Sequence, residues 1–255
     1  GSGRIVGLGG AYTAIAEGID GAPWTPATYA SRTLWELDWF EWDIDVGVLF
    51  PLSFARNDFF NSGSPDGFRF KDFFFFSGGL RFQIGDVGFG GVLRNQTYRL
   101  VGPSGEHINA ALGEGNVGIA RQFLGGQVIV GVGSRIADLG LSFPNSTVDL
   151  VRFTGYGGEA GILVRAEGQP WRAGVSGRLP VRTREIRGEE AERDSNGVLV
   201  AKGIVLPREV YQPWELTLGF AIQFGDRALN LAWTDPADLD RAAVERATVA
   251  RVERE

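Results

Sequence analysis

Large apolar side chains alternate with polar or small ones along residues 214–224. A period of two puts successive side chains on opposite faces of a β-strand, so that one face is apolar and the other polar. The same alternation recurs in residues 37–49, 72–84, 87–94, 116–123, 128–135, 159–166 and 171–181. The pattern predicts an all-β chain of antiparallel amphipathic strands.

Alternation alone fits two kinds of sheet. A soluble sheet turns its apolar face to a core, whereas a membrane barrel turns it to lipid and its polar face to the lumen. No run of about 18 apolar residues is present, so the sequence predicts no transmembrane helix. A barrel strand needs only about 9–11 residues. Trp39 and Trp42, near the start of one strand, are typical of an aromatic belt at a membrane interface.

The connections between the strands are uneven in length, which favours the membrane barrel. Short turns are expected at Gly85-Asp86, Gly125-Gly126, Glu167–Gln169 and Gly225-Asp226. Longer polar loops are expected at residues 57–67, 101–106, 139–147 and 187–197. Short turns at one end and long loops at the other are typical of outer-membrane barrels.

Charged residues lie on the face opposite the apolar one. Unpaired charges are costly in a packed core, whereas in a lumen they pair or stay hydrated. We therefore expect eleven lumen-facing charges: Glu41, Asp43, Asp45, Arg81, Arg94, Arg135, Glu159, Arg165, Arg172, Arg178 and Glu215. They fit either a structural charge network or a site in which a few of them hold a substrate carboxylate.

Composition excludes several classes of function. The net charge is −6 and no basic stripe is present, which argues against nucleic acid as a partner. Cysteine is absent and His107 is the only histidine, so the common thiolate and histidine metal sites are excluded. Ser104 lies near His107, but no third residue completes a triad. We therefore predict no catalytic residue, no metal site, no cofactor and no enzymatic activity.

Residues 7–32, GLGGAYTAIAEGIDGAPWTPATYASR, precede the strands and are rich in Gly and Ala. The Gly9-Gly10 pair permits close backbone approach to another surface. Pro23 and Pro26 prevent a regular helix over residues 22–26, so we expect a short helix only over about residues 11–17. A dinucleotide-binding GxGxxG motif fits poorly, because Tyr12 occupies the third glycine position. An N-terminal arm without a special role also fits the composition.

The same residues carry a family resemblance. Gly9, Gly10, Tyr12 and their neighbours Ala11, Thr13, Ala14 and Ala16 match a GxGGAYTAxA motif, and Thr25, Pro26 and Ala27 stand where an Asn-Pro-Ala tripeptide would be. This segment resembles the N-terminal plug of the FadL-type outer-membrane transporters of long-chain fatty acids and other hydrophobic compounds. Residues 213–219, PWELTLG, resemble a late strand of that family.

The resemblance implies a transmembrane β-barrel with an N-terminal plug in the outer membrane of a Gram-negative bacterium. The implied function is passive uptake of hydrophobic small molecules such as fatty acids, with membrane lipids and that ligand as partners. A non-transporting barrel that anchors a surface, motility or secretion complex is the alternative, and a soluble β protein is a third.

The expected organisation is a plug at residues 1–36, barrel strands at 37–235 and a charged helical extension or loop insertion at 236–255. Asp235-Pro236 is typical of a helix start. About nine or ten strand-like segments are visible, whereas the resemblance implies about fourteen in an even-numbered barrel. We therefore expect an incomplete barrel, completed by a later segment or by another polypeptide.

Overall fold

The computed structural model describes the chain in separate stretches: residues 11–31, 40–49, 73–101, 107–143, 150–183, 192–193, 195, 197, 199–201, 204–205, 209–225 and 229–230. Gly9, Gly10, Trp39, Ser104 and the helix expected at 236–255 lie outside the described residues.

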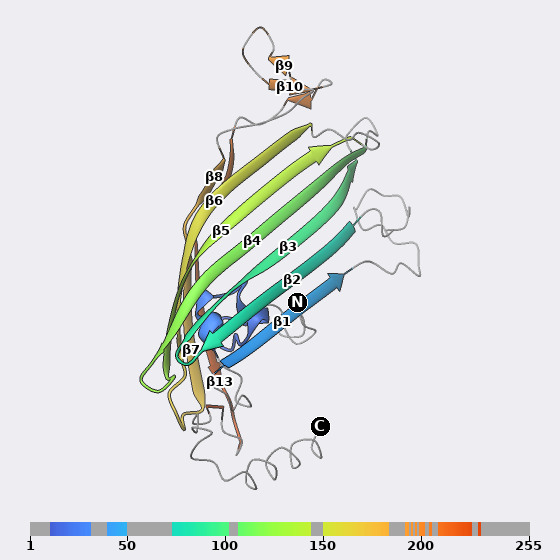
Figure 1. Ribbon diagram of the computed structural model, residues 1–255. Coiled ribbons are helices and arrows are strands. Elements are labelled where there is room, and N and C mark those ends of the chain that lie inside the picture. The colour runs from blue at the N-terminus through green and yellow to red at the C-terminus, as the bar shows by residue number, and fades with distance from the viewer. Residues whose placement is uncertain are drawn as a thin grey trace.

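One antiparallel sheet of eight strands dominates the fold (Figure 1). In spatial order its strands are β1 (Phe40–Leu49), β2 (Phe73–Ile84), β3 (Val87–Val101), β4 (His107–Phe123), β5 (Val128–Ser142), β6 (Val151–Val164), β7 (Trp171–Arg178) and β13 (Glu215–Ile222). Each strand pairs with its neighbour in the chain, except that β7 pairs with β13. The all-β prediction is confirmed.

Short strands fill the connection between β7 and β13. A two-stranded ribbon pairs β8 (Val181–Thr183) with β12 (Val210–Gln212). A small three-stranded sheet holds β9 (Glu192–Arg193), β10 (Leu199–Ala201) and β11 (Ile204–Val205). The expectation of a loop throughout 187–197 is therefore wrong at β9, where pairing with β10 orders Glu192 and Arg193.

The two ends of the large sheet differ in their connections. β2 and β3 are joined by the two-residue turn Gly85-Asp86, and β4 and β5 by residues 124–127. Leu124, Gly125 and Gly126 all have positive φ, which tight turns of this kind require. At the other end most connections are longer, and β7 is joined to β13 through the short strands, although only residues 102–106 join β3 to β4. The predicted asymmetry of the connections holds except at the β3–β4 connection, which is shorter than residues 165–170 between β6 and β7.

Several strands are longer than the alternating stretches of the sequence, β3 and β6 among them. β4 begins at His107 and not at Asn116, and β5 runs on to Ser142, so that residues 139–142 are strand and not loop. Residues 109–115 are mostly small, which hides the alternation. Pairing with β3 on one side and β5 on the other fixes this part of β4 as strand, because cross-strand contacts outweigh local preference.

The register gives the sheet two distinct faces. On β1, Phe40, Trp42, Ile44, Val46 and Val48 are all exposed, whereas Glu41 between the first two is buried. Cross-strand partners continue the same division into the rest of the sheet. We call the apolar face outward and the opposite face inward.

Residues 11–31, the N-terminal segment, pack on the inward face. The segment contains two 3-10 turns, η1 (Ile19–Gly21) and η2 (Pro26–Ala30). Figure 1 shows it between the strands in front and β7 and β13 behind. The buried core is formed between this segment and the sheet, by Ile19, Ala22, Ala27, Tyr29, Ala30, Val92, Ala120, Ile129 and Leu163. The short helix expected over 11–17 is absent, and a turn at residues 13–15 stands in its place.

Neither edge of the large sheet is paired within the described residues. β1 pairs only with β2, and β13 only with β7. An eight-stranded barrel has an interior that side chains alone fill. The space inside this sheet already holds the N-terminal segment, so closing β1 on β13 would leave no room for it. Among the described residues the helices are single 3-10 turns, and none has the length and apolar character to span a bilayer.

Neighbouring residues on β6 provide a test of the two faces. Leu163 is 0% exposed on the inward face, and Ile162 is 40% exposed on the outward face. Leu163→Ala should lower the free energy of unfolding by about 2–5 kcal/mol, because it leaves a cavity against the N-terminal segment. Ile162→Ala is the matched control and should lower it by much less. Equal shifts of the urea-unfolding midpoint in the two variants would contradict this assignment of faces.

Candidate functional site

The candidate site is the inward face together with the N-terminal segment seated on it. Thr25 precedes η2 as its N-cap, and its Oγ1 accepts a hydrogen bond from the Ala27 amide at 3.4 Å. Pro26 occupies the first turn, where its missing N–H is not needed. The Thr28 hydroxyl donates to the Thr25 carbonyl at 3.0 Å. These local bonds hold a compact turn that a longer helix could not replace in the same space.

Glycines make the close contact between segment and sheet possible. A Cβ added at Gly118 would lie 2.6 Å from Tyr29 Cε2, and one added at Gly174 would lie 2.7 Å from the Thr13 carbonyl oxygen. Both distances are too short for real atoms. The inward glycines against which the segment packs are Gly79, Gly88, Gly90, Gly118, Gly131, Gly161, Gly174 and Gly219. They come from β2 to β7 and from β13, so most of the sheet contributes to this glycine floor.

Buried Arg81 joins the segment to β1 and β2. Its guanidinium forms an ion pair with Glu41 and donates to the carbonyl oxygens of Ser31 at 3.1 Å and Tyr29 at 3.4 Å. Its side chain is 0% exposed and that of Glu41 is 1% exposed. A charge removed from water in this way is tolerated only with close partners, so the pair fixes how the segment sits.

Three more predicted lumen charges hold the segment elsewhere. Asp43 Oδ2 accepts from the Ile19 amide at 2.8 Å. Arg172 Nη1 lies 2.5 Å from Glu17 Oε1, and Arg178 donates to the Pro23 carbonyl. The segment is thus bonded to β1 at one side of the sheet and to β7 at the other.

A second group of charges lies around Glu159. Asn116 Nδ2 donates to Glu159 Oε2 at 3.0 Å, and Arg178 Nε lies 3.6 Å from the same oxygen. Arg178 Nη1 also donates to Glu215 Oε2 at 3.0 Å. Arg94 pairs with Glu114 at 2.7 Å. These contacts link β3, β4, β6, β7 and β13 across the inward face.

Arg135 differs from the other arginines of this group. Its side chain is 6% exposed, and it makes no hydrogen bond or ion pair with the residues that the structure describes. Glu159 Oε1 and the Tyr29 hydroxyl are also buried without a hydrogen-bond partner there. Burial raises the pKa of the Tyr29 phenol, so it stays protonated and able to donate. Buried polar groups of this kind are usually satisfied by water or by a ligand.

The remaining predicted charges have different surroundings. Asp45 Oδ2 accepts from Ser77 at 3.5 Å. Arg165 follows β6, and its Nε donates to the Gly126 carbonyl at 2.9 Å. Burial lowers the pKa of the Arg165 guanidinium to about 10. All the charges predicted from the sequence to face the lumen thus lie at inward positions of the strands. Arg165 is the exception, because it follows the last residue of β6, where it continues the inward alternation of that strand.

The structure also places the other residues singled out from the sequence. Tyr12, Thr25, Pro26 and Ala27 are buried in the N-terminal segment. His107 begins β4 and does not lie in a loop. Within the described part of the chain, no three His, Asp or Glu side chains are arranged to hold a metal ion.

Asn230 is a site residue that the sequence analysis missed. Its side-chain nitrogen donates to the carbonyl oxygens of Ala166, Gln169 and Trp171, at 2.8–2.9 Å, and its oxygen accepts from Arg172 Nε at 2.7 Å. Asn230 therefore connects the part of the chain after β13 with the β6–β7 turn and, through Arg172, with the N-terminal segment. A lone asparagine in a short apolar run carries no signal for this role.

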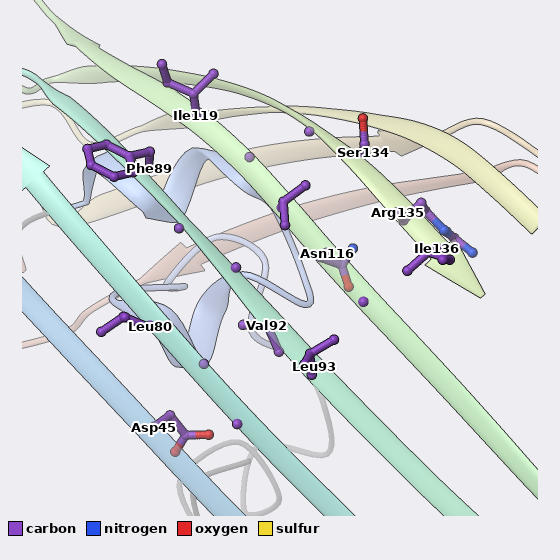
Figure 2. Close-up of a pocket in the computed structure, with 18 of the residues that line it drawn as sticks. Asp45, Leu80, Phe89, Val92, Leu93, Asn116, Ile119, Ser134, Arg135 and Ile136 are labelled. Atoms are coloured by element: carbon purple, nitrogen blue, oxygen red, sulfur yellow. The ribbon is translucent and has the colours of Figure 1, made fainter. Parts of the chain in front are cut away.

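The outward face carries a hollow of about 1290 Å³ across β1 to β6 (Figure 2). In Figure 2 the near side of the sheet carries the side chains of Leu80, Phe89, Leu93, Ile119 and Ile136. The N-terminal segment lies behind the sheet in the same view. Most of the side chains that line the hollow face outward, although some inward residues, Asn116 and Arg135 among them, also contribute to its lining.

No family model, no curated protein and no solved structure matches this chain.

The Arg81–Glu41 pair provides one test of the inward site. Arg81→Met should lower the free energy of unfolding by about 3–5 kcal/mol, because it leaves the buried Glu41 carboxylate without its guanidinium. The double variant Arg81→Met/Glu41→Leu should recover much of that loss. Urea unfolding of the single and double variants measures both effects. A double variant as unstable as Arg81→Met alone would contradict a penalty that arises from the unpaired charge.

The glycine floor provides another test. A Cβ at Gly131 would lie 2.5 Å from the Ala27 amide nitrogen, whereas Gly177 on the outward face has no atom within 4 Å of its Cβ position. Gly131→Val should displace the N-terminal segment at a cost of about 1–3 kcal/mol. Hydrogen exchange in residues 11–31 should quicken in Gly131→Val and stay unchanged in the matched control Gly177→Val. Unchanged exchange in both variants would show that the segment does not depend on the floor.

Proposed function

We propose that this chain forms the wall and plug of an outer-membrane β-barrel of a Gram-negative bacterium, and that the barrel is a passive channel for hydrophobic small molecules such as long-chain fatty acids. The observation that carries the proposal is the band of apolar side chains on the outward face. On β1, β2, β5, β6 and β13 it runs over Phe40–Val48, Phe76–Ile84, Val128–Ile136, Tyr156–Val164 and Leu216–Phe224. Each run is about nine residues, the length that crosses a bilayer as a tilted strand.

The exposure of this band supports lipid as its surroundings. Leu93, Leu218 and Phe220 are each about two-thirds exposed or more. Soluble proteins rarely expose a continuous apolar surface of this extent. The opposite face carries the charges and holds the N-terminal segment, as a lumen with a plug would. Arg135, which lies on that face, suits the polar end of an amphipathic ligand.

Further strands are part of the proposal. The outer edges of β1 and β13 carry backbone groups that no described strand satisfies. In lipid each such group costs several kcal/mol, so an open edge there requires a partner strand. We propose that strands from another polypeptide or from further residues of this one lie between β1 and β13 and enclose the N-terminal segment.

The firm seating of the N-terminal segment favours the alternative, a barrel that anchors a surface, motility or secretion complex without transport. Ala16, Ala27 and Tyr29 are fully buried, and the segment bonds to β1, β2 and β7. A plug held in this way leaves the channel closed until it moves.

A transfer assay separates these functions. The full chain, with its completing strands, should insert into phospholipid vesicles and speed the passage of a fluorescent fatty acid over that in protein-free vesicles. Gly131→Val should speed it further, because it loosens the segment, whereas Gly177→Val should not. Insertion without faster transfer in any variant would favour the anchor.

Cysteine labelling reports insertion independently of transport. In vesicles a membrane-impermeant maleimide should react with Thr217→Cys, which faces inward, and should spare Leu218→Cys, which is 74% exposed on the outward face. Both should react in urea. Ready labelling of Leu218→Cys in intact vesicles would rule out the membrane assignment itself.

A further inference from the structure

We propose that the outward hollow binds one acyl chain of a membrane phospholipid as a fixed site on the barrel wall. This inference rests on the proposed function, because it requires the outward face to lie in the bilayer. It concerns a lipid held outside the barrel, on the face opposite the inward site and any transported molecule.

Small residues in two adjacent rows of the sheet create the hollow. One outward row runs through Val46, Gly78, Leu93, Gly115, Ile136 and Tyr156, and the next through Ile44, Leu80, Gly91, Val117, Ser134 and Gly158. In both rows large side chains are interrupted by glycine or serine, and the interruptions are staggered between the rows. The hollow crosses β1 to β6 and has walls of branched and aromatic side chains (Figure 2). It is narrower over Gly91 and Gly115, where the side chains of Val117, Leu93 and Ile136 reach into the space above the glycines.

The chemistry of the lining fits hydrocarbon. Among the outward side chains of the hollow only Ser134 and Tyr156 carry a polar atom. Asp45, Asn116 and Arg135 are also among the residues that line the hollow, but their side chains occupy inward positions. A folded protein partner needs roughly one hydrogen bond per 100–200 Å² of interface, which this surface does not offer. An acyl chain needs none and gains from each methylene that it buries.

A polar cluster lies at one end of the hollow. Asp138 and Thr154 face outward one row beyond Ile136 and Tyr156. Arg152 binds Asp138 through two hydrogen bonds of 3.0 and 3.1 Å, and the Thr154 hydroxyl donates to the same carboxylate at 2.6 Å. The apolar band ends here on β5 and β6, so this is the level of the lipid headgroups. A phospholipid with its head beside this cluster directs its chain past Tyr156 into the hollow.

A single substitution can fill the hollow without disturbing the fold. At Gly78 the nearest atoms to an added Cβ are those of the Phe76 ring at 3.4–3.5 Å, which is ordinary contact. Gly78→Leu therefore places a side chain in the space of the acyl chain. Gly177→Leu is the matched control, because Gly177 also faces outward on a strand, has no atom within 4 Å and does not line the hollow.

The test uses the complete protein reconstituted in vesicles of palmitoyl-oleoyl phosphatidylethanolamine, extracted in mild detergent and examined by native mass spectrometry. The parent protein and Gly177→Leu should retain one phospholipid. Gly78→Leu should lose it at least about tenfold more readily, because excluding a few methylene groups weakens binding by that much.

Equal retention by the three proteins, or retention of a free fatty acid or a peptide in place of phospholipid, would overturn the inference. Flotation with the vesicles is measured on the same samples. If all three proteins float and retention is equal, the acyl-chain site fails while the membrane assignment stands. If none floats, the membrane assignment fails and the acyl-chain site fails with it.

Discussion

The N-terminal segment lies so close to the inward face that many of the strand positions beneath it are glycine. Backbone and side-chain atoms of residues 13–29, including those of Ile19 and Tyr29, occupy the places where Cβ atoms at the inward glycines would be. Contact of this closeness brings backbone polar groups out of water, and each must find a partner. The arginines and carboxylates of the surrounding strands are those partners. The glycine floor and the buried charges therefore act together. The glycines permit the segment to approach the sheet closely, and the charged side chains form hydrogen bonds with the backbone groups that this approach buries.

The same constraint explains why the two faces differ so strongly. Every charge that bonds the segment points inward, which leaves apolar residues for the other face of the same strands. Glu41 is 1% exposed while its neighbour Trp42 is 58% exposed. With a side-chain period of two, a shift of one residue in register would break the ion pairs and bury the apolar band at once. The register is therefore fixed from both sides of the sheet.

Alternation in the sequence was enough to predict the strands and the inward positions of the charges. Residues 40–48 and 214–222 carry the pattern without interruption. The prediction failed where small residues dilute the pattern, as in residues 109–115 of β4. It was also wrong in predicting a short helix over about residues 11–17, where the structure has a turn at residues 13–15. The glycine floor and Asn230 could not be predicted. A glycine in a strand looks the same whether it faces lipid or a packed segment, and Asn230 acts only through residues distant in sequence.

The bonds from Arg172 to Glu17 and from Arg178 to Pro23 each join residues 155 positions apart in the chain. Contacts of such long range form late in folding, since closing a long loop costs entropy that only already assembled structure can offset. The β2 to β7 meander needs only local hairpins, whereas the N-terminal segment needs β7 and β13 in place before it can seat. Residues 11–31 are therefore expected to take up their place after the strands that follow them in the sequence. Until then their small apolar side chains and the glycine floor are both uncovered, so the chain is most prone to aggregation before the segment seats.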